Sequence, residues 1–450
     1  MSEDPGFARA LATRLAEAGR EGDASFVAPN VGVHRASTVL FDTLAATDAA
    51  GAAAAVGRRR ATTYGTVGTP TTMALMDALC EIEGAGCAVR ASLMPSGLAA
   101  ITTALLAVLV PGDHLLVADS SYGPTRVFCD GMLARLGVRT TYYDPTIGAG
   151  IEALLRPETK LIWLESPGSY TFEVQDVPAI CAIARKRGIV TMIDNTWASP
   201  VFARPFDWGV DASVLALTKY WGGHSDVLMG AVVVREALWP KLWAAVRQLG
   251  QCASGDDAYL VLRGLRSVDV RMRRHEAHAL EVARWLEARA EVAGVLYPAL
   301  ASHPQHALWR RDFSGASGLL SFELDRALFA PGRDEVHAHG DPGRAHGDPG
   351  RASGDTGRAS GDTGRASERE RVALAALCER RRHFAIGYSW GGFESLIMPA
   401  RIDRMRTARP WTGGPLVRLH VGLEDPEDLI ADLADGFDAM GRVLAASGPG

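Results

Sequence analysis

The feature that most constrains the fold is a regular alternation of helical and strand-like segments between about residues 72 and 235. Apolar residues recur at helical spacing in 73–84, 124–137 and 177–188, and short apolar runs occupy 114–119, 138–144, 160–165, 189–194, 213–218 and 230–235. Such alternation is typical of βαβ units and predicts an α/β fold with a mostly parallel, buried sheet and helices on both faces. Ligands of these sheets bind beyond the carboxyl ends of the strands, so functional side chains are expected there.

The remainder of the chain divides into an arm and a second domain. Residues 1–70 contain one helical segment, 7–19, and then an irregular stretch without a core of its own, which indicates an arm. We place the large domain at 71–265 and a smaller α+β domain at 266–450. This second domain opens on a helix over 269–288, with strands expected at 318–324 and 415–423; in the helix, apolar and aromatic residues recur at helical spacing at Val270, His278, Val282 and Trp285.

A Gly-rich repeat interrupts the second domain. The unit A-[HS]-G-D-[PT]-G-R occurs four times between Ala338 and Arg365 and offers no apolar face that could be buried. Ordering this insertion, which we place at 333–368, would cost backbone entropy with little return, so a disordered surface insertion is predicted. The alternative is a metal-binding or partner-binding tether that uses His337, His339 and His346.

Composition narrows the classes of partner. The 450 residues are 47% hydrophobic, and the formal charge of −5 leaves no basic field for nucleic acid or an anionic membrane. The six cysteines form no C-x-x-C pair, which argues against a zinc site or a disulfide framework. The first ten residues lack the apolar segment of a signal peptide, and the longest apolar run, 98–110, is too short to span a bilayer. We therefore expect a soluble, cytoplasmic protein that binds a small molecule and no metal.

Two of the predicted strands end in charged residues. Asp194 ends the run VTMID, and Lys219 follows the run SVLALT. Desolvation makes both charges costly, so a compensating interaction is expected. Lys219 is either part of a structural ion pair or a Schiff-base nucleophile whose pKa is lowered by burial, and the sequence leaves both open. Asp194 could keep a ring nitrogen protonated or could cap the turn that follows it.

A second group of residues suits a phosphate. The stretch MPSGLAAITTALLAVL opens an apolar helix, whose first backbone N–H groups and dipole favour an anion. An ordinary N-cap is the alternative for a Ser-Gly pair at this place. The candidate phosphate ligands are Ser96, Gly97 and Leu98, and Thr218 adds a hydroxyl donor beside the lysine.

Tyr122 is a further candidate for contact with a bound ligand. It follows the strand-like run 114–119 at the same expected edge of the sheet, where its ring could stack on a planar heterocycle, although loop packing is the commoner use of such a residue. A phosphate cup, a stacking ring, an acid for a pyridine nitrogen and a lysine amine are together the parts that pyridoxal 5'-phosphate (PLP) needs. PLP is therefore the expected cofactor.

The chain resembles the Cys/Met-metabolism family of PLP-dependent enzymes in seven motifs that occur in the family's order. They read MPSGLAAI, SYGPT, LESPGSYTFEVQDVPAI, IDNTWASPVF, TKYWGGHSD, YSWGGFESL and VRLHVGLEDPEDLIADL. The resemblance runs from about Phe7 to Met440 and is interrupted only by the repeat. It implies fold type I of the PLP-dependent transferases, the aspartate-aminotransferase-like fold.

The resemblance also implies a role for each candidate residue. Lys219 binds the cofactor aldehyde and acts as the catalytic base, Asp194 pairs with the pyridinium nitrogen, and Tyr122 stacks on the ring. Tyr64 or Tyr122 assists the proton transfers. Contacts to the phosphate are assigned to Ser96, Gly97, Leu98 and Thr218.

In this family, a Tyr and an Arg from the arm of a neighbouring subunit also reach the cofactor phosphate. The stretch TTYGTVGTPTT supplies Tyr64, but Thr66 stands where the Arg would be, which removes one charge-assisted bond. Arg58, Arg59 and Arg60 are the candidates to compensate. Because such sites are shared between subunits, the resemblance implies a homo-oligomer, a tetramer built from dimers.

The substrate side rests on two motifs. Arg418 matches the family's clamp for the substrate α-carboxylate, since a guanidinium pairs two N–H groups with two oxygens; a strand arginine that faces solvent is the alternative. Trp390, with Tyr388 and Ser389, matches the branch that performs β-elimination. The implied reaction cleaves the Cβ–S bond of L-cystathionine, or of a related cysteine S-conjugate, to a thiol, pyruvate and ammonia. The γ-lyase and γ-synthase branches of the family are the first alternative.

A different class of α/β protein is the second alternative. The sequence contains no G-x-x-x-x-G-K-[ST] motif, and GTVGTP follows no predicted strand, so the signatures of nucleotide binding are absent. The histidines of HEAH, His275 and His278, miss the spacing of a zinc-binding helix by one residue. A catalytically inert relative would have lost Lys219 or Asp194, and both are present.

Overall fold

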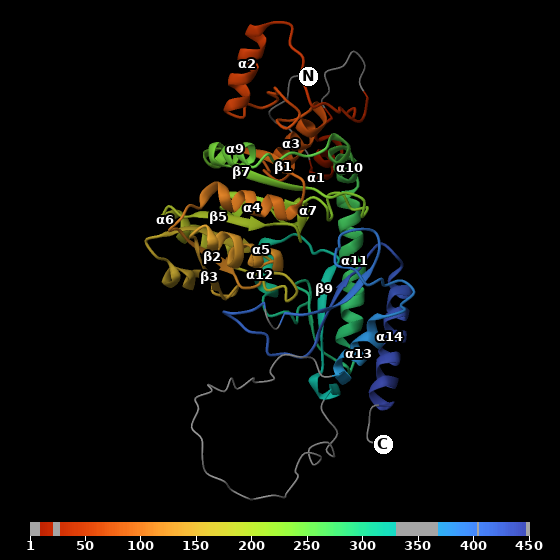
Figure 1. Ribbon diagram of the computed structural model, residues 1–450. Coiled ribbons are helices and arrows are strands. Elements are labelled where there is room, and N and C mark those ends of the chain that lie inside the picture. The colour runs from red at the N-terminus through yellow and green to blue at the C-terminus, as the bar shows by residue number, and fades with distance from the viewer. Residues whose placement is uncertain (1–9, 21–27, 330–367, 403–404, 447–450) are drawn as a thin grey trace, which may run out of the picture.

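The computed structural model describes residues 10–20, 28–329, 368–402 and 405–446, and within them it contains a large and a small β-sheet (Figure 1). The Gly-rich repeat, including His337, His339 and His346, lies outside the described residues. Both interpretations of the repeat therefore remain predictions.

Seven strands form the large sheet, in the order β1-β7-β6-β5-β4-β2-β3. The strands from β6 to β3 pair in parallel, whereas β7 runs antiparallel to both β6 and β1. The prediction of a mostly parallel α/β sheet is confirmed, and β1 at one edge is an addition to it. The bounds are β1 Val89–Met94, β2 His114–Ala118, β3 Arg139–Tyr143, β4 Thr159–Glu165, β5 Val190–Asp194, β6 Ala212–Ala216 and β7 Gly230–Arg235.

Helices cover both faces of this sheet. One hydrophobic cluster joins the strands to α4 (Gly97–Val108), α9 (Trp239–Gln248) and the π-helical turn η1 (Cys129–Leu133) that continues α5 (Gly123–Phe128). The other cluster contains apolar residues of α3 (Pro70–Ile82), α6 (Val177–Lys186) and α10 (Gly255–Leu265). Local signals set the helix ends: the side chain of Thr69 caps α3 directly before Pro70, and the side chain of Asp176 caps α6.

The arm contains more helix than the sequence predicts. Its first helix, α1 (Leu11–Glu17), was expected, but the stretch expected to be irregular contains α2 (Leu44–Ala55), capped by Thr43. This helix is rich in alanine, so it forms through intrinsic propensity and shows no apolar stripe that periodicity could detect. Figure 1 shows α2 projecting away from the large sheet, at the end of the molecule that carries α9 and α3.

The C-terminal part is built on a four-stranded antiparallel sheet, in the order β10-β11-β9-β8. The expected long helix is α11 (Val268–Glu287), but Val270 is 71% exposed and is not part of its buried face. Val268, Met272 and His275 lie on that face instead. The strands are β8 Val292–Leu296, β9 Leu319–Leu324, β10 Leu396–Ala400 and β11 Leu416–His420, and the other helices are α12 His306–Asp312, α13 Glu368–Cys378 and α14 Pro426–Ala446.

Short helices complete the connections. The segment after β5 forms two single turns, α7 and α8, and 3-10 turns follow β3, β7 and β9. Their bounds are η2 Gly148–Leu154, α7 Ser199–Phe202, α8 Pro205–Trp208, η3 Glu236–Leu238 and η4 Arg326–Phe329.

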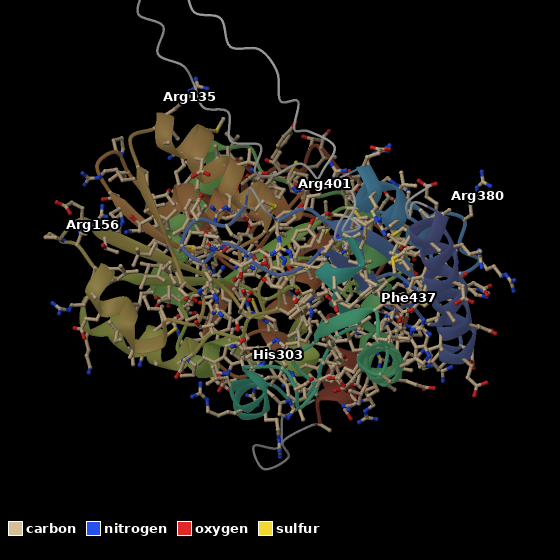
Figure 2. All side chains as sticks on the ribbon, turned by 90° about the horizontal axis from the view of Figure 1, so that it is seen from below. Arg135, Arg156, His303, Arg380, Arg401 and Phe437 are labelled. Atoms are coloured by element: carbon tan, nitrogen blue, oxygen red, sulfur yellow. The ribbon has the colours of Figure 1, made fainter. Side chains whose placement is uncertain are left out.

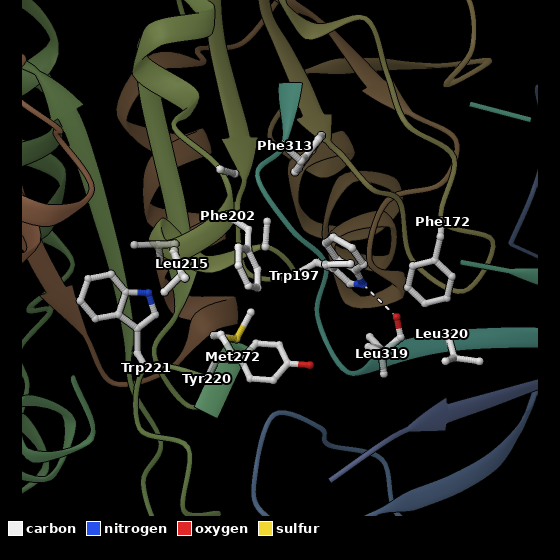
Figure 3. Packing of buried hydrophobic residues seen from close by; sticks show 14 of the residues in the cluster. Phe172, Trp197, Phe202, Leu215, Tyr220, Trp221, Met272, Phe313, Leu319 and Leu320 are labelled. Carbon is white, nitrogen blue, oxygen red and sulfur yellow. Dashed lines mark hydrogen bonds between the residues drawn. The ribbon is translucent and has the colours of Figure 1, made fainter. Parts of the chain in front are cut away.

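A continuous core joins the large and the small sheet. Trp197, which follows β5, packs beside Phe172, and its indole N–H donates a hydrogen bond to the carbonyl of Leu319 on β9 at 3.0 Å (Figure 3). Tyr220 lies in the same cluster, directly after Lys219. The loop that contains Lys219 is therefore held between the two sheets.

Asp119 directly follows β2 of the large sheet. It binds the connection between β10 and β11 of the small sheet. Its side chain is fully buried, pairs with Arg126 at 2.8 Å, and accepts hydrogen bonds from the backbone N–H groups of Thr407, Ala408 and Arg409 at 2.9–3.0 Å. Burial by itself would raise the pKa of Asp119. The hydrogen bonds from Thr407 and Arg409 and the charge of Arg126 outweigh burial and hold this pKa below its ordinary value.

Asp119→Asn should therefore lower the free energy of unfolding by about 2–3 kcal/mol, because the amide cannot accept every one of these hydrogen bonds and leaves Arg126 without its counter-ion. Chemical denaturation measures this change. Asp207→Asn is the matched control, since Asp207 forms an exposed ion pair with Arg204 at 3.0 Å, and its loss should cost less than about 1 kcal/mol. Equal losses in the two variants would contradict the role of Asp119.

The surface carries dispersed charge. Figure 2 shows Arg135, Arg156 and Arg380 projecting outward at separate places on the periphery. Across the described ranges, no helix has both the length and the apolar character needed to span a membrane.

Candidate active site

The candidate residues of the large sheet meet at the carboxyl ends of its central strands. Asp194 is the last residue of β5, and it lies in register with Glu165, the last residue of β4. Lys219 follows β6, the next strand of the sheet, by three residues. One amine and two carboxylates thus lie at the edge of the sheet where ligands of such sheets bind, beyond the carboxyl ends of the strands.

Lys219 has no carboxylate partner in the described part of the chain. Its Nζ donates a hydrogen bond to Oγ of Ser389 at 2.8 Å and lies 5.2 Å from the centre of the Trp390 ring. Burial, and then the positive charge of Arg418, lower the pKa of Lys219 to about 8, while the charge of Asp194 opposes this effect. These contacts favour a reactive amine over a structural ion pair.

The lowered pKa predicts how the stability of the protein depends on pH. The pKa of Lys219 is about 8 in the folded protein and 10.5 in a free lysine, so the unfolded chain binds more protons between these pH values. Burial of the ammonium therefore destabilises the fold below pH 8, and this cost disappears as the pH rises toward 10.5. Without cofactor, Lys219→Met should be more stable than the unchanged protein at pH 7, by at most about 3 kcal/mol.

Denaturation of the two proteins at pH 7 and at pH 10 checks this prediction, and the difference should shrink at the higher pH. Lys186→Met is the control, since Lys186 is exposed in the last turn of α6. A Lys219→Met protein that is less stable than the unchanged protein at pH 7 would contradict it.

Asp194 is held in place by the turn that follows β5. The backbone N–H of Thr196 donates to its Oδ1 at 3.0 Å, so the capping role proposed as the alternative is present too. Burial raises the pKa of Asp194, and the hydrogen bonds from Thr196 and the charge of Lys219 oppose only part of that rise. A cationic partner would stabilise this carboxylate further.

The start of α4 lies against the loop that leads to Lys219. Ser96 caps the helix by accepting a hydrogen bond from the N–H of Ala99 at 3.1 Å, which leaves its own hydroxyl hydrogen free to donate. A Cβ atom on Gly97 would lie 2.8 Å from that of Ala216, so only glycine allows this close approach of α4 to β6. The N–H groups of Gly97 and Leu98 are in the first helical turn and have no acceptor within the helix.

Thr218 makes two hydrogen bonds within the chain. Its hydroxyl accepts a hydrogen bond from the N–H of Met229 at 3.0 Å and donates to the carbonyl of the same residue at 3.2 Å. The hydroxyl hydrogen is thus bound within the chain. A contact from Thr218 to a phosphate requires this hydrogen to turn away from Met229.

Tyr122 lies at the N-terminus of α5 with 44% of its surface exposed. Burial, and then the charges of Asp194 and Glu165, raise the pKa of its hydroxyl, which places the ring among the carboxylates at this edge. The backbone N–H of Tyr122 donates to Glu165 at 2.7 Å. The side chain of Tyr122 is therefore near the two carboxylates and is not packed away in the core.

Arg418 is buried on β11 and has no ion pair among the described residues. Its guanidinium donates to the carbonyls of Gly387 at 2.7 Å, Tyr388 at 3.1 Å and Ser389 at 3.3 Å, and its Nε–H has no acceptor. The alternative of a solvent-facing arginine is wrong, because every residue of β11 is buried. Burial lowers the pKa of this guanidinium, so a carboxylate would stabilise it.

The segment of Tyr388, Ser389 and Trp390 lies between Arg418 and Lys219. Ser389 touches both, through its carbonyl and its hydroxyl, and Trp390 packs against Tyr220 with ring centres 5.5 Å apart. Tyr388 is 84% exposed. These residues thus lie at the site, with Tyr388 at its outer side.

The arm residues are not brought to this site within one chain. Tyr64 is 51% exposed and forms an isolated β-bridge with Thr38. Arg59 and Arg60 pair with Asp77, at 3.5 and 3.1 Å, beside a cavity lined also by Arg58. Thr66 lines a separate hollow together with residues of α3, β1 and α9. Whether any of these residues serves the cofactor phosphate remains a prediction.

Sequence reasoning missed two residues of the site. Glu165 ends the predicted strand 160–165 just as Asp194 ends 189–194, so the strand-end rule could have identified it. Tyr170 lies with its ring centre 6.0 Å from the guanidinium carbon of Arg418. It belongs to the loop after β4 and adopts a positive φ of 66°, and no sequence signal singles it out.

The donors and acceptors of this site fit PLP. The amine of Lys219 is available for an aldehyde, the carboxylate of Asp194 for a ring nitrogen, the ring of Tyr122 for stacking, and the free amides at the start of α4 for a phosphate. No group of three or more His, Cys, Asp and Glu side chains within the described residues is arranged to hold a metal ion.

Comparison with known proteins agrees with this site. The family model for "Cys/Met metabolism PLP-dependent enzyme" matches residues 12–337 and 365–438. Cystathionine β-lyase MetC of Escherichia coli (strain K12) is 39% identical over 434 residues, which cover 95% of this chain and 98% of that protein. The L-alanine/L-glutamate racemase of Wolbachia pipientis wMel is 38% identical over 429 residues, covering 93% and 94%.

Solved structures show the same fold. The crystal structure of cystathionine γ-synthase from Xanthomonas oryzae pv. oryzae in complex with aminoacrylate and cysteine has a TM-score of 0.78 and 30% identity, and the match covers 97% of this chain and 100% of that one. With the family model, these likenesses confirm the expected type of fold and PLP as the cofactor. The chain belongs to the Cys/Met metabolism family of PLP-dependent enzymes.

Proposed function

We propose that this protein is a carbon–sulfur lyase that cleaves the Cβ–S bond of L-cystathionine, or of a related cysteine S-conjugate, to a thiol, pyruvate and ammonia. The observation that carries the proposal is that two cations, the partly buried Lys219 amine and the buried Arg418 guanidinium, lie on either side of Ser389 and have no carboxylate partner in the described chain. An amino acid substrate supplies the missing carboxylate. Relatives named cystathionine β-lyase, at 37–40% identity, support the choice of reaction.

Five parts of the chain would hold the cofactor. Lys219 would hold its aldehyde, Asp194 its ring nitrogen and Tyr122 the face of its ring, and the phosphate would lie at the start of α4, with Ser96, Gly97, Leu98 and Thr218. When bound, PLP withdraws electrons from the substrate's Cα, which makes the Cα proton removable. With PLP bound, Asp194 would keep the ring nitrogen protonated, because a carboxylate in a desolvated site is stabilised by a cation at hydrogen-bond distance.

Lys219 carries out the proton transfers. The substrate's amine would first take the place of Nζ on the cofactor aldehyde, which frees Nζ. The lowered pKa of about 8 favours the unprotonated amine, so Nζ can then take the proton from the substrate's Cα. The resulting ammonium can then give a proton to the sulfur as the Cβ–S bond breaks. The Ser389 hydroxyl, which accepts a hydrogen bond from Nζ, orients the amine between these two positions.

Arg418 positions the substrate. Its guanidinium binds the α-carboxylate with two parallel N–H groups, and the substrate competes for these groups with the carbonyls of residues 387–389. Trp390 closes the site beside Lys219, and Tyr388 lies at its entrance. A fixed carboxylate sets the direction of the Cα–H and Cβ–S bonds relative to Nζ.

The products of cystathionine cleavage test the proposal. We expect purified holoprotein to release pyruvate and homocysteine, and little 2-oxobutyrate. Formation of 2-oxobutyrate with cysteine instead would assign the protein to the γ-elimination branch, and formation of cystathionine from cysteine and an activated homoserine would assign it to the γ-synthases.

Racemisation is a second candidate activity, because a relative 38% identical to this chain is an L-alanine/L-glutamate racemase. Both reactions begin with removal of the Cα proton, which Lys219 is placed to perform. Incubation with L-alanine and chiral separation of the product measures it. D-Alanine at a rate similar to pyruvate release from cystathionine would favour the racemase.

We further propose that the protein works in the cytoplasm, in methionine biosynthesis, as a tetramer built from dimers with shared active sites. In the arm, Leu40, Leu44 and Val56 are 88%, 84% and 69% exposed, which an adjoining copy would bury. Tyr64 of one copy would then complete the site of another. If so, mixing inactive Tyr64→Ala and Lys219→Ala proteins should restore part of the activity, since each mixed dimer contains one intact site.

A further inference from the structure

Glu165 is a buried carboxyl group that none of the roles above uses. It ends β4 in register with Asp194 on β5, and only 7% of its surface is exposed. A carboxylate at such a place needs donors, because burial without them would be costly. Its two oxygens have different donors, which come from two different loops.

The first donor is the backbone of Tyr122. The Tyr122 N–H donates to Glu165 Oε2 at 2.7 Å, and this bond holds the residue directly before α5. The side chain of Tyr122 makes no capping hydrogen bond to its own helix. The orientation of the ring relative to the site therefore depends on an acceptor from outside α5, and Glu165 is that acceptor.

The second donor is on the loop that follows β4. The Ser169 hydroxyl donates to Glu165 Oε1 at 2.6 Å, and the Ser169 N–H donates to the carbonyl of Ser120 at 2.7 Å. Ser120 is two residues before Tyr122. Two hydrogen bonds thus hold the β2–α5 loop to the end of β4. One joins Glu165 to the backbone of Tyr122, and the other joins Ser169, which is itself bound to Glu165, to the backbone of Ser120.

The charge of Glu165 follows from its surroundings. Burial, and then the negative charge of Asp194, raise the pKa of Glu165 to about 8, which favours its protonated form. In either form Oε2 accepts from Tyr122; the Ser169 hydroxyl donates to an ionised Oε1, and a proton on Oε1 would reverse that one hydrogen bond. A glutamine has the same shape and the same pattern of one acceptor and one donor.

We propose that Glu165 is a positioning residue that fixes the Tyr122 ring over the cofactor site by holding the Tyr122 backbone N–H. The proposal rests on the proposed role of Tyr122 in stacking on the PLP ring. It predicts that a neutral acceptor at position 165 is sufficient, so Glu165→Gln should preserve the arrangement and Glu165→Ala should lose it.

Two measurements on the holoprotein test this inference. The first is hydrogen exchange of the Tyr122 amide at single-residue resolution, which we expect to be about tenfold faster in Glu165→Ala and close to the unchanged protein in Glu165→Gln. The second is visible circular dichroism of the bound cofactor, which reports the asymmetric surroundings of its ring. We expect the signal to change in Glu165→Ala and to return in Glu165→Gln.

Glu173→Ala is the matched control. Glu173 is a partly buried carboxylate in the same loop, but it pairs with Arg406 at 3.2 Å and accepts from Thr171. Its loss should leave both the Tyr122 amide and the cofactor signal unchanged.

Each result bears on the inference separately from the proposed function. An unchanged Tyr122 amide in Glu165→Ala would overturn the inference, and so would a Glu165→Gln protein that behaves like Glu165→Ala. Faster exchange with an unchanged cofactor signal would show that the ring is not positioned from Glu165, and would overturn it too. If the protein without substitutions gives no cofactor signal, the proposed function is contradicted. The exchange data would still decide whether Glu165 holds the Tyr122 backbone.

Discussion

Lys219→Ala should lower kcat/KM for cystathionine by about a thousandfold or more, because it removes the base for the Cα proton and the acid for the departing sulfur in one change. Among the described residues, Ser389 is the group that shares a hydrogen bond with Nζ, and a serine hydroxyl is a far weaker base than an amine with a pKa of about 8. Steady-state measurement of pyruvate release checks the prediction.

Chemical rescue distinguishes a lost amine from a damaged site. Added methylamine should restore part of the activity of Lys219→Ala, since a small amine can enter the space that the side chain leaves. Lys186→Ala, which changes an exposed lysine of α6, should retain full activity. A Lys219→Ala protein that keeps more than a tenth of the activity without added amine would contradict the assigned role.

Arg418→Ala should lower kcat/KM by about a hundredfold to a thousandfold, mainly through KM, because the α-carboxylate loses its charge-assisted hydrogen bonds. Arg418→Lys should lose about tenfold, since an ammonium keeps the charge but not the two parallel N–H groups. These losses in kcat/KM are expected only for substrates that carry an α-carboxylate. Steady-state kinetics with cystathionine measure them.

The same variants also loosen contacts to the carbonyls of residues 387–389, so a control for this effect is needed. A substrate analogue that lacks the α-carboxylate provides this control. The protein without substitutions and the Arg418→Lys variant should bind the analogue equally weakly. Arg382→Lys, at an exposed arginine, should leave the kinetics unchanged. Equal losses for cystathionine and for the analogue would show that Arg418 acts through the loop and not through the substrate.

The edge of the sheet where the site lies could be predicted because Asp194 and Lys219 interrupt apolar runs. A charge at the end of a buried strand is costly, and that cost is visible in one sequence without any structure. Glu165 obeys the same rule, but its importance depends on register. Only the pairing of β4 with β5 places it beside Asp194, and only the loop geometry gives it the N–H of Tyr122.

Other features could not be predicted for identifiable reasons. Alternation along 416–420 suggests one buried and one exposed face, whereas β11 lies between β10 and β9 and is buried on both. Arg418 therefore carried no sequence signal of burial. The helix α2 is alanine-rich and has no apolar periodicity. For α11, a hydrophobic spacing that includes Val270 fits a helical period, but the packing selects the neighbouring face with Val268 and Met272.

The central claim is that the Lys219 amine holds the aldehyde of PLP in the site that it shares with Asp194 and Arg418. Reduction of the holoprotein with borohydride, digestion and mass spectrometry test this claim most directly, because reduction makes the link between amine and aldehyde permanent. We predict a pyridoxyl label on Lys219, and no label in Lys219→Ala. A label on another lysine, or an unlabelled protein that nevertheless releases pyruvate from cystathionine, would contradict the account.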